Sequence, residues 1–405
     1  MKVMIVAPYI YEERWPEFSR NRTGFGMIVR DLFFSLSSAQ DVYLLTNVIT
    51  KGYGSILSHT WAEVLKSARP SDWIAGLKLF FNYHQGLKKR CRYFVYGLNT
   101  GYFEKTIKEY APDIIHIHGI GMATKPYIDA CVKKKVPFIL TLHGLIGLDE
   151  SIKTNKWDKE LEKEFLIYAS DHSIPVTVIS SGIKKRIEKN YLNHIANNIT
   201  VIPNGTSFLT GQECLNEEYS NLREKYSIKN NDSIIVVIGS ICENKNQQQI
   251  IRALALSDIR NKSHVFLCGM DSTNGELEKL IVDNHLTERV HVLGFVSHDT
   301  VHQILEQATL NIVASKNEGF GLSVIEAFSH GIPTVCFSDI DSVDDLYSKD
   351  SMMLVEERTD EALAKTIEDA LIKKWKREDI ISHSKLFSMD RMVKSYQNLY
   401  FKIGW

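Results

Sequence analysis

Two carboxylates, Glu318 and Glu326, stand eight residues apart, and a glycine-aromatic-glycine turn lies between them. Glycine lets the backbone approach a ligand closely, and the pattern from Leu322 onward predicts a helix. The N–H groups and positive dipole end of a helix N-terminus suit a phosphate. One carboxylate could therefore bind a sugar and the other a ribose, with a diphosphate between them. The residues of the turn are Gly319, Phe320 and Gly321.

These residues need a scaffold, and the chain alternates short apolar runs with helical patterns twice over. Such runs predict parallel strands that are covered by helices on both faces, which is an α/β fold. In the first half the predicted strands are 2–7, 42–45, 114–118, 138–143 and 175–179. In the second half they are 233–239, 264–267, 290–293, 310–313 and 334–337.

The two series predict two doubly wound domains in tandem, with a boundary near Gly205. We expect a first domain over residues 1–205 and a second over 206–385, followed by an amphipathic helix within 386–405. In such sheets ligands bind at the carboxyl ends of the strands. With two domains, that predicts a site in the cleft between them.

Composition narrows the class of protein. The chain has 405 residues, 44% of them hydrophobic and 24% charged, as in ordinary globular proteins. A net charge of -1 argues against bulk nucleic-acid binding. Its six cysteines are scattered and include no C-x-x-C pair, so we expect no metal site. This distribution favours free thiols in a reducing cytoplasm. No run approaches the roughly 20 apolar residues that span a bilayer.

Several segments together resemble the retaining glycosyltransferases of family 4. Residues 317–333 match the Glu-x7-Glu signature of that family, and further blocks follow in the family's order. The resemblance implies the GT-B fold, in which a C-terminal helix crosses back onto the first domain. It also implies metal-independent transfer from a nucleotide-sugar, UDP- or GDP-linked, without a cofactor. The further blocks are Thr23–Met27, Pro112–Gly119, Thr141–Gly144, Val201–Gly205, and Gly239 with Lys245-Asn246.

In the second domain, the resemblance implies a role for each matching residue. Glu326 should bind the ribose hydroxyls of the nucleotide, and Glu318 should hold hydroxyls of the donor sugar. The backbone from Gly319 to Leu322 should offer N–H groups to the same sugar and to a phosphate. Lys245 should stabilise charge on the departing diphosphate. The family usually has an arginine directly after the glycine at position 239, where this chain has Ser240.

In the first domain, Gly24 and Gly26 should let a loop close over the diphosphate and sugar. His143 matches the family's histidine near the donor sugar. We expect His116 and His118 on opposite faces of one strand, so that at most one, His118, reaches the cleft. A structural role for His118 stays equally open. Asn204 lies in the block that leaves the first domain and is a further cleft candidate.

The acceptor side is less marked in the sequence. Residues 72–94 combine aromatic side chains with clustered lysine and arginine, as a membrane-surface segment would. The alternative is a pair of core helices with solvated lysines. Membrane contact would favour a lipid-linked saccharide of a cell-surface polymer as acceptor, handled at the inner face of the membrane.

Two other functions stay open at this point. One is a nucleotide-sugar epimerase or a glycosyl phosphorylase on a similar two-domain frame. The other is a non-catalytic subunit that binds a nucleotide-sugar or glycan and assists a partner enzyme. Ser240 is the residue that keeps the second alternative open.

Overall fold

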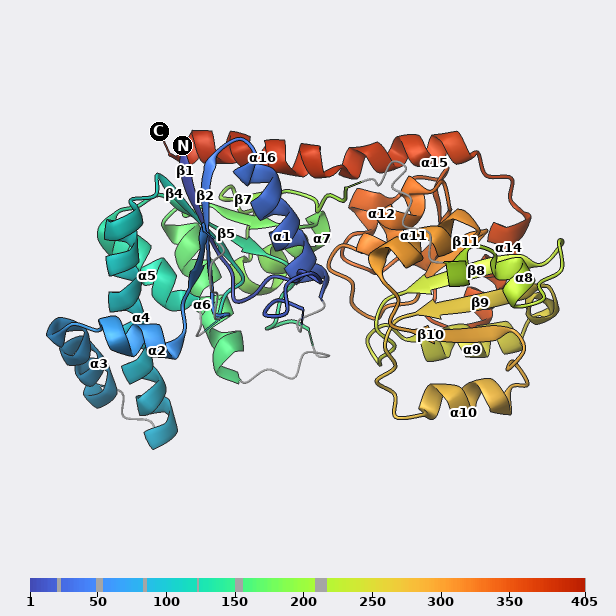
Figure 1. Cartoon of the computed structure of the whole chain (residues 1–405), viewed down its shortest axis with the longest axis horizontal. Coiled ribbons are helices and arrows are strands. Elements are labelled where there is room, and N and C mark those ends of the chain that lie inside the picture. The colour runs from blue at the N-terminus through green and yellow to red at the C-terminus, as the bar shows by residue number, and fades with distance from the viewer. Residues whose placement is uncertain are drawn as a thin grey trace. The chain divides into compact units, whose positions relative to one another are not determined.

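The computed structural model describes residues 1–19, 23–48, 54–82, 86–121, 124–149, 156–207 and 217–404. Contacts divide the chain into two compact units (Figure 1). Unit 1 comprises Met1–Ile179, Ile183–Gly205 and Met389–Trp405, and unit 2 comprises Ser180–Gly182 and Thr206–Ser388. The first unit is therefore built from segments at both ends of the sequence.

Within the described residues, unit 1 holds a seven-stranded sheet in the order β3-β2-β1-β4-β5-β6-β7, and all its pairs are parallel. The central strands β4 and β5 are buried along their whole length, including the polar residues His116, His118 and Thr141. The strands are β1 (Lys2–Val6), β2 (Asp41–Thr46), β3 (Ile56–Ser58), β4 (Ile114–His118), β5 (Phe138–Leu142), β6 (Val176–Val178) and β7 (Ile199–Val201).

The helices of unit 1 follow the strands in the alternating order expected for a doubly wound sheet. They are α1 (Gly24–Ser37), α2 (Trp61–Ser67), α3 (Pro70–Asn82), α4 (Leu87–Tyr110), α5 (Lys125–Lys134), α6 (Lys156–Asp171), α7 (Ser181–Ile187), which begins in unit 2, the short η1 (Glu188–Leu192) and α16 (Met389–Ile403).

Helix α16 returns to unit 1 after unit 2 is complete. It buries one stripe of side chains, among them Tyr396 and Tyr400, and it packs beside α1. The Tyr400 hydroxyl lies 2.7 Å from Nδ1 of His116 in β4, so α16 is joined to the centre of the sheet by a buried hydrogen bond. The predicted C-terminal helix that returns to the first domain is confirmed.

Unit 2 repeats the same plan, with a described sheet of six parallel strands in the order β10-β9-β8-β11-β12-β13. The strands are β8 (Ser233–Ile238), β9 (Ser263–Cys268), β10 (Val290–Gly294), β11 (Leu310–Val313), β12 (Thr334–Phe337) and β13 (Met352–Val355). The helices are α8 (Leu222–Lys225), α9 (Gln247–Ala255), α10 (Glu276–Asp283), α11 (His298–Glu306), α12 (Leu322–Ser329), α13 (Val343–Leu346), α14 (Asp360–Ile372) and α15 (Arg377–Ser384), with the short η2 (Glu217–Tyr219), η3 (Asp258–Asn261) and η4 (Lys385–Phe387).

In both units the strand order reverses beside the first strand, between β1 and β4 and between β8 and β11. Such reversal points are where ligands bind in open α/β sheets, because the loops leaving the two strands diverge there. The α/β prediction of two doubly wound domains is confirmed. The loops that follow β1, β4, β8 and β11 are therefore the places to look for a site.

Candidate functional site

In unit 2, a lysine and a glutamate from two different loops meet at the reversal point. Lys245 comes after β8 and Glu318 comes after β11, and Lys245 Nζ lies 2.5 Å from Glu318 Oε2. The hydroxyl of Ser315 donates to the same oxygen at 3.1 Å. The structure thus brings together two residues that sequence analysis assigned to one donor site. Ser315 is an addition that the sequence did not single out.

Close backbone packing shapes the loop after β8. Gly239 has φ +133, a conformation that glycine adopts readily, and a Cβ there would meet Lys245 Cε at 3.6 Å. The stem of Lys245 therefore lies over Gly239. Ser240, which stands at the family's arginine position, is exposed, and its carbonyl accepts a hydrogen bond from Gln247 Nε2 at 3.1 Å.

Asn244 fixes the loop after β11 relative to the loop after β8. Its side-chain amide donates to the Asn317 carbonyl at 3.0 Å, and its Oδ1 accepts from the Asn317 N–H at 3.1 Å. The Asn244 carbonyl also accepts from the Lys316 N–H at 2.7 Å. Asn244 thus positions the backbone directly before Glu318. Sequence analysis missed this role, since only its place one residue before Lys245 pointed to it.

The turn between Glu318 and Glu326 is anchored by a buried aromatic side chain. Phe320 is 2% exposed, and its ring packs edge-on against Phe387 at 5.9 Å between centroids. Gly321 is the N-cap of α12 with φ +86, where an L side chain would be strained. Gly319 lies in the same turn, and Leu322 is the first helical residue. The helix predicted from Leu322 onward is confirmed, and Glu326 lies within it, whereas Glu318 lies in the loop before it.

Glu326 has a histidine partner that the sequence analysis did not predict. It is 7% exposed, and its Oε1 lies 3.2 Å from Nε2 of His298, the first residue of α11. Burial alone would raise the pKa of Glu326. The hydrogen bond from His298 and the nearby imidazoles outweigh it, so the pKa lies below its usual value. Glu326 is therefore a buried but ionised carboxylate.

In unit 1, the predicted histidines cluster at the carboxyl ends of β4 and β5. His118 ends β4, His143 follows β5, and His118 Nδ1 lies 2.9 Å from His143 Nε2. Phe25, from the start of α1, packs edge-on against the His143 ring at 4.8 Å. Phe25 also packs edge-on against the His118 ring at 6.4 Å, so the start of α1 contacts both histidines.

Burial decides the charge of this histidine pair. It lowers the pKa of His143 to about 4. Burial, together with His116 and His143, also lowers the pKa of His118 well below its usual value, so both rings are neutral at neutral pH. A neutral imidazole has one donor and one acceptor nitrogen. Since Nε2 of His143 is engaged by His118, a hydrogen bond from His143 to a ligand must use Nδ1.

The expectation that His116 and His118 lie on opposite faces is wrong. Residues two apart on a strand share a face, and these two rings are only 4.0 Å apart between centroids. His116 is 0% exposed, and its two nitrogens contact Tyr400 and Thr141, at 2.7 and 2.6 Å. His116 is thus a packing residue beneath His118.

The remaining first-domain candidates are Gly24, Gly26 and Asn204. Gly24 is the exposed first residue of α1, and Thr23 caps that helix by accepting a hydrogen bond from the Gly26 N–H. A Cβ on Gly26 would come within 2.9 Å of the Tyr11 backbone nitrogen, so packing alone requires glycine there. Asn204 is 5% exposed, and its Oδ1 is buried without a hydrogen-bond partner among the described residues.

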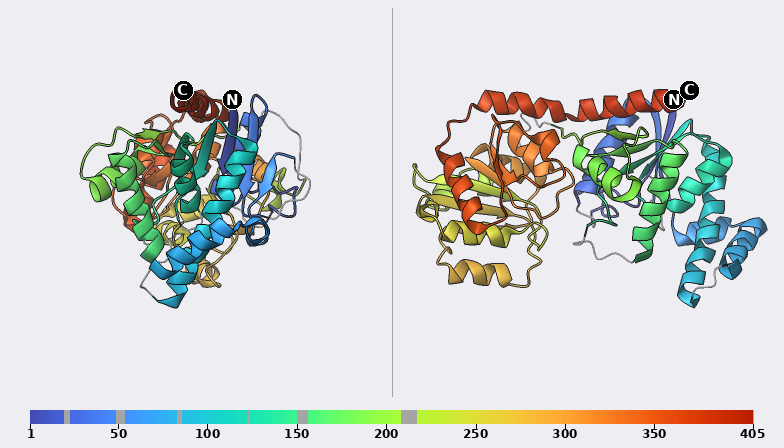
Figure 2. Two further views of the ribbon diagram at one scale, coloured as in Figure 1. Left: turned by 90° about the vertical axis from the view of Figure 1, so that its left-hand side faces the viewer. Right: turned by 180° about the vertical axis from the view of Figure 1, so that it is seen from behind.

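The predicted membrane-surface segment 72–94 forms a helical hairpin of α3 and the first turns of α4; residues 83–85 lie outside the described residues. The two helices approach closely, since a Cβ on Gly97 would lie 2.8 Å from the Gly76 Cα. Figures 1 and 2 show the hairpin standing away from the sheet of unit 1. The large apolar side chains that it exposes are Trp73, Ile74, Leu77, Phe81 and Leu87.

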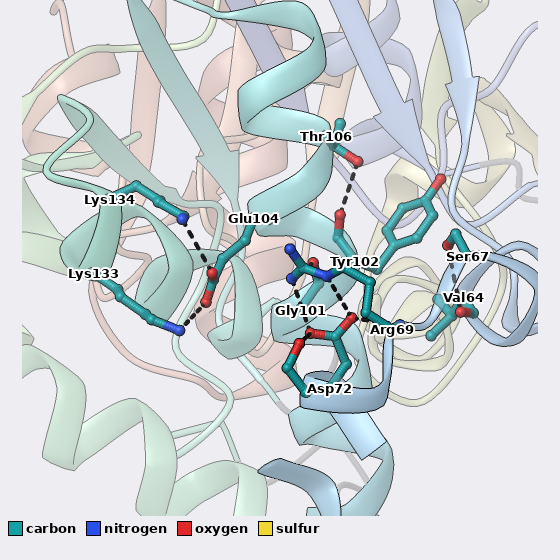
Figure 3. Close-up of polar contacts among 11 residues, drawn as sticks. Val64, Ser67, Arg69, Asp72, Gly101, Tyr102, Glu104, Thr106, Lys133 and Lys134 are labelled. Carbon is teal, nitrogen blue, oxygen red and sulfur yellow. Dashed lines mark hydrogen bonds and ion pairs between the residues drawn. The ribbon is translucent and has the colours of Figure 1, made fainter. Parts of the chain in front are cut away.

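Ion pairs lie at the start of α3 and in the part of α4 that follows the hairpin (Figure 3). Asp72, at the start of α3, accepts from Arg69 Nε and Nη2 at 3.0 and 2.9 Å. Glu104 of α4 contacts Lys133 and Lys134 of α5, at 2.5 and 3.3 Å. Charged contacts thus join α4 to α5 beyond the hairpin, while the five apolar side chains named above are exposed.

Two family models match the chain, one for each half. Residues 57–207 match Glycosyltransferase Family 4, and residues 218–387 match Glycosyl transferases group 1. The second match contains Lys245, Glu318 and Glu326, and the first contains His118 and His143.

Two bacterial relatives are each 23% identical to this chain over the stretch that they match. An N-acetyl-alpha-D-glucosaminyl L-malate synthase of Bacillus anthracis is 23% identical over 55% of this chain and 56% of its own length. TuaC of Bacillus subtilis (strain 168), provisionally assigned to teichuronic acid biosynthesis as a glycosyltransferase, is 23% identical over 65% of this chain and 63% of its own.

Solved structures of glycosyltransferases share the fold over nearly the whole chain. A glycosyltransferase from Rickettsia africae ESF-5 has a TM-score of 0.73 at 17% identity and covers 99% of this chain and 98% of its own. Anabaena Alr3699/HepE, solved in complex with UDP and glucose, has a TM-score of 0.69 at 17% identity, covering 99% of this chain and 100% of its own. At this identity the likeness establishes the fold.

Proposed function

Since this chain belongs to the glycosyltransferases of the family 4 type and has their GT-B fold, we propose that it is a retaining enzyme that transfers a sugar from a nucleotide-sugar. The acceptor is a glycan or a lipid-linked saccharide, and no metal ion takes part. The relative assigned to teichuronic acid biosynthesis supports a role in the synthesis of a bacterial cell-surface polysaccharide. The complex of a similar structure with UDP and glucose supports a nucleoside-diphosphate sugar as donor.

The contact between Lys245 and Glu318 carries this proposal. The sugar and the diphosphate of a donor are covalently joined, so the groups that bind them must be neighbours. Glu318 is the proposed partner of the sugar hydroxyls, and Lys245 is the proposed partner of the diphosphate. Their side chains lie 2.5 Å apart although 73 residues separate them in the sequence. Glu326, in the same helix-and-turn segment, is proposed to bind the ribose.

The proposed reaction proceeds on one face of the sugar. The acceptor oxygen forms a bond to the anomeric carbon as the bond from that carbon to the diphosphate oxygen breaks. The acceptor proton passes to the leaving phosphate oxygen. Catalysis then depends on positioning and on stabilisation of the leaving charge, to which Lys245 contributes. A covalent sugar adduct trapped on Glu318 would overturn this mechanism.

We further propose that the α3–α4 hairpin rests on an anionic membrane surface at the cytoplasmic face. Residues 73–103 contain five lysines and arginines and no aspartate or glutamate. Exposed aromatic and aliphatic side chains beside clustered base are typical of interfacial segments. In the described part of the chain, no helix combines the length and apolar character needed to cross a bilayer.

A thermal-shift series with UDP, GDP, ADP and their sugar conjugates tests the donor site. A nucleotide at about 100 times its dissociation constant should add roughly 2.7 kcal/mol to the free energy of unfolding. Glu326→Gln should remove most of the shift, whereas Glu318→Gln should keep the shift from the free nucleotide and lose turnover. If neither substitution changes binding or turnover, the site assignment is wrong.

The second candidate is a non-catalytic subunit, and Ser240 is the observation that favours it. Ser240 is exposed and stands where the family usually has an arginine. The leaving diphosphate would therefore have one positively charged partner fewer than in the rest of the family. Measurable sugar transfer by the purified protein would exclude this candidate. The non-catalytic candidate would be favoured if the wild-type protein and the Ser240→Arg variant both bind a nucleotide and neither transfers a sugar.

A further inference from the structure

Helices α11 and α12 set four titratable side chains opposite one another in two rungs, here called the histidine ladder. The first rung joins His298 Nε2 to Glu326 Oε1 at 3.2 Å, and the second joins His302 Nδ1 to His330 Nε2 at 2.5 Å. Both rungs connect residues 28 apart in the sequence. His298 and His302 are four residues apart on α11, and Glu326 of α12 is four residues from His330, the C-cap of that helix, so each pair shares one face. Helices α11 and α12 are labelled beside each other in Figure 1.

The first rung fixes the direction of one proton. A carboxylate can only accept hydrogen bonds, so Nε2 of His298 must carry a hydrogen and donate it to Glu326. The hydrogen bond uses Oε1 of Glu326 and so fixes the orientation of the carboxylate plane relative to α11. Hydrogen bonds to charged groups are the stronger class, so the contact restrains Glu326 effectively.

The start of α11 is itself fixed, which makes His298 a rigid donor. Ser297 is the N-cap of α11, and its hydroxyl accepts a hydrogen bond from the Thr300 N–H at 3.1 Å. Such a cap defines the first turn of the helix, where His298 lies. The side chain of His298 is 36% exposed, whereas that of Glu326 is 9% exposed. His298 thus reaches from a capped helix end to a buried carboxylate.

The second rung holds the helices together without adding charge. His302 is 7% exposed, and its Nε2 is buried without a hydrogen-bond partner among the described residues. Burial, together with His298 and His330, lowers the pKa of His302 to about 4, and burial and Arg377 lower that of His330 to about 4. Both rings are neutral at neutral pH, and the direct hydrogen bond to Glu326 comes from the first rung.

We propose that His298 is a positioning residue that orients the Glu326 carboxylate for the ribose hydroxyls, with the second rung fixing the spacing of α11 and α12. This inference rests on the proposed role of Glu326 in nucleotide binding. No metal site explains the cluster, since the described residues contain no group of three side chains suited to a metal ion. His298 acts through Glu326, so its loss should matter only for ligands that carry ribose hydroxyls.

The test compares UDP, GDP and ADP with their 2′,3′-dideoxy counterparts by calorimetry, on the full chain. Wild type should prefer the bound ribonucleotide to its dideoxy counterpart by roughly tenfold or more, as expected for hydrogen bonds to a charged group. His298→Leu should remove most of this preference and leave dideoxynucleotide affinity unchanged. His298→Gln, whose amide can still donate near the Nε2 position, should restore most of it.

Controls separate this inference from the function beneath it. Asp299→Ala, at the exposed next residue of α11, should leave the preference intact. If Glu326→Gln removes the preference but His298→Leu does not, His298 is only a packing residue and the inference fails. If wild type shows no preference, or binds none of the three nucleotides, the ribose role of Glu326 fails as well. An equal loss for both members of a nucleotide pair in His298→Leu would also overturn the positioning role.

Discussion

The ammonium group of Lys245 and the carboxylate of Glu318 form an ion pair of 2.5 Å across the two loops that leave β8 and β11. Their side chains are 28% and 13% exposed, so the pair is neither fully solvated nor sealed in the core. Each partner lies at the carboxyl end of a strand beside the reversal point of the sheet. This arrangement gives a donor sugar and its leaving group adjacent partners.

Removing the Lys245 charge should slow turnover more than it weakens binding. We expect Lys245→Met to lower kcat by about 100-fold to 1,000-fold, as when one stabilising donor is removed from developing charge. Lys316→Met is the matched control, since Lys316 is an exposed neighbour paired with exposed Glu243 at 3.0 Å. Steady-state kinetics with the identified donor measure both variants. Equal effects of the two substitutions would contradict the role of Lys245.

His143 should tolerate asparagine better than glutamine. His118 occupies Nε2 of His143 at 2.9 Å, so the ligand-facing nitrogen is Nδ1. The asparagine side-chain amide lies near the Nδ1 position, whereas that of glutamine lies near the Nε2 position. We therefore expect His143→Asn to retain more transfer activity than His143→Gln. The reverse order would show that the ring acts through Nε2.

Both units should lose stability on acidification, because each buries neutral histidine. Burial lowers the pKa of His59 in unit 1 and of His302 in unit 2 to about 4, whereas the unfolded value is near 6.5. The unfolded chain therefore binds protons first as the pH falls. Each group stabilises the fold fully above pH 6.5 and loses that contribution between pH 6.5 and 4, at up to about 1.4 kcal/mol per pH unit.

Urea denaturation at pH 7.5, 6.0 and 5.0 measures this dependence. His59→Gln should reduce the acid sensitivity of unit 1, at the cost of the buried hydrogen bond between His59 and Tyr127. Tryptophan fluorescence and limited proteolysis can follow the two units separately. An unchanged midpoint from pH 7.5 to 5.0 would contradict the prediction.

A methyl group at Gly97 should destabilise unit 1. The added Cβ would lie 2.8 Å from the Gly76 Cα, so α3 and α4 must move apart. Overpacking of this kind costs about 1–3 kcal/mol. Gly144→Ala is the control, since its Cβ would meet no atom within 4 Å. Thermal unfolding should show a lower midpoint for Gly97→Ala alone.

Anionic vesicles should bind the chain through the α3–α4 hairpin. Lys78→Gln with Lys88→Gln should reduce sedimentation with vesicles that contain phosphatidylglycerol, because each basic residue adds about 1 kcal/mol near such a surface. The control pair is Lys105→Gln with Lys108→Gln, which removes the same charge from exposed positions near the end of α4. Arg90 is kept, since it holds the Phe80 carbonyl at 2.9 Å. Equal loss in both pairs would indicate unspecific attraction.

Periodic apolar runs allowed the architecture to be predicted, since the central strands of both sheets are nearly continuous Val, Ile and Leu. The edge strands β3, β7 and β13 were missed. They are as short as β6, β11 and β12, which were predicted, but they are only partly buried. Residues 51–108 were the least patterned, and the structure shows why. The buried residues of α3 are Asp72 and Gly76, while four of its large apolar residues, Trp73, Ile74, Leu77 and Phe81, are exposed.

Within the candidate site, sequence motifs located the carboxylates, the lysine and the histidines, but not their partners. Asn244 acts through three hydrogen bonds to a loop that is distant in the sequence. His298 contacts Glu326 only because α11 and α12 lie side by side. Neither contact leaves a local signature. The equal four-residue spacings of His298 with His302 and of Glu326 with His330 were the one pattern that could have suggested the ladder.

The return of α16 to unit 1 also sets an order of events during synthesis. His116 lies at the centre of the first sheet, and its Nδ1 partner is the hydroxyl of Tyr400. The ribosome synthesises β4 long before residue 400. The first sheet therefore lacks its contact with α16 until unit 2 has been translated. Domains generally fold as units when their segments have emerged. Both segments of unit 2, Ser180–Gly182 and Thr206–Ser388, are made before α16, so unit 2 is expected to fold to completion before unit 1.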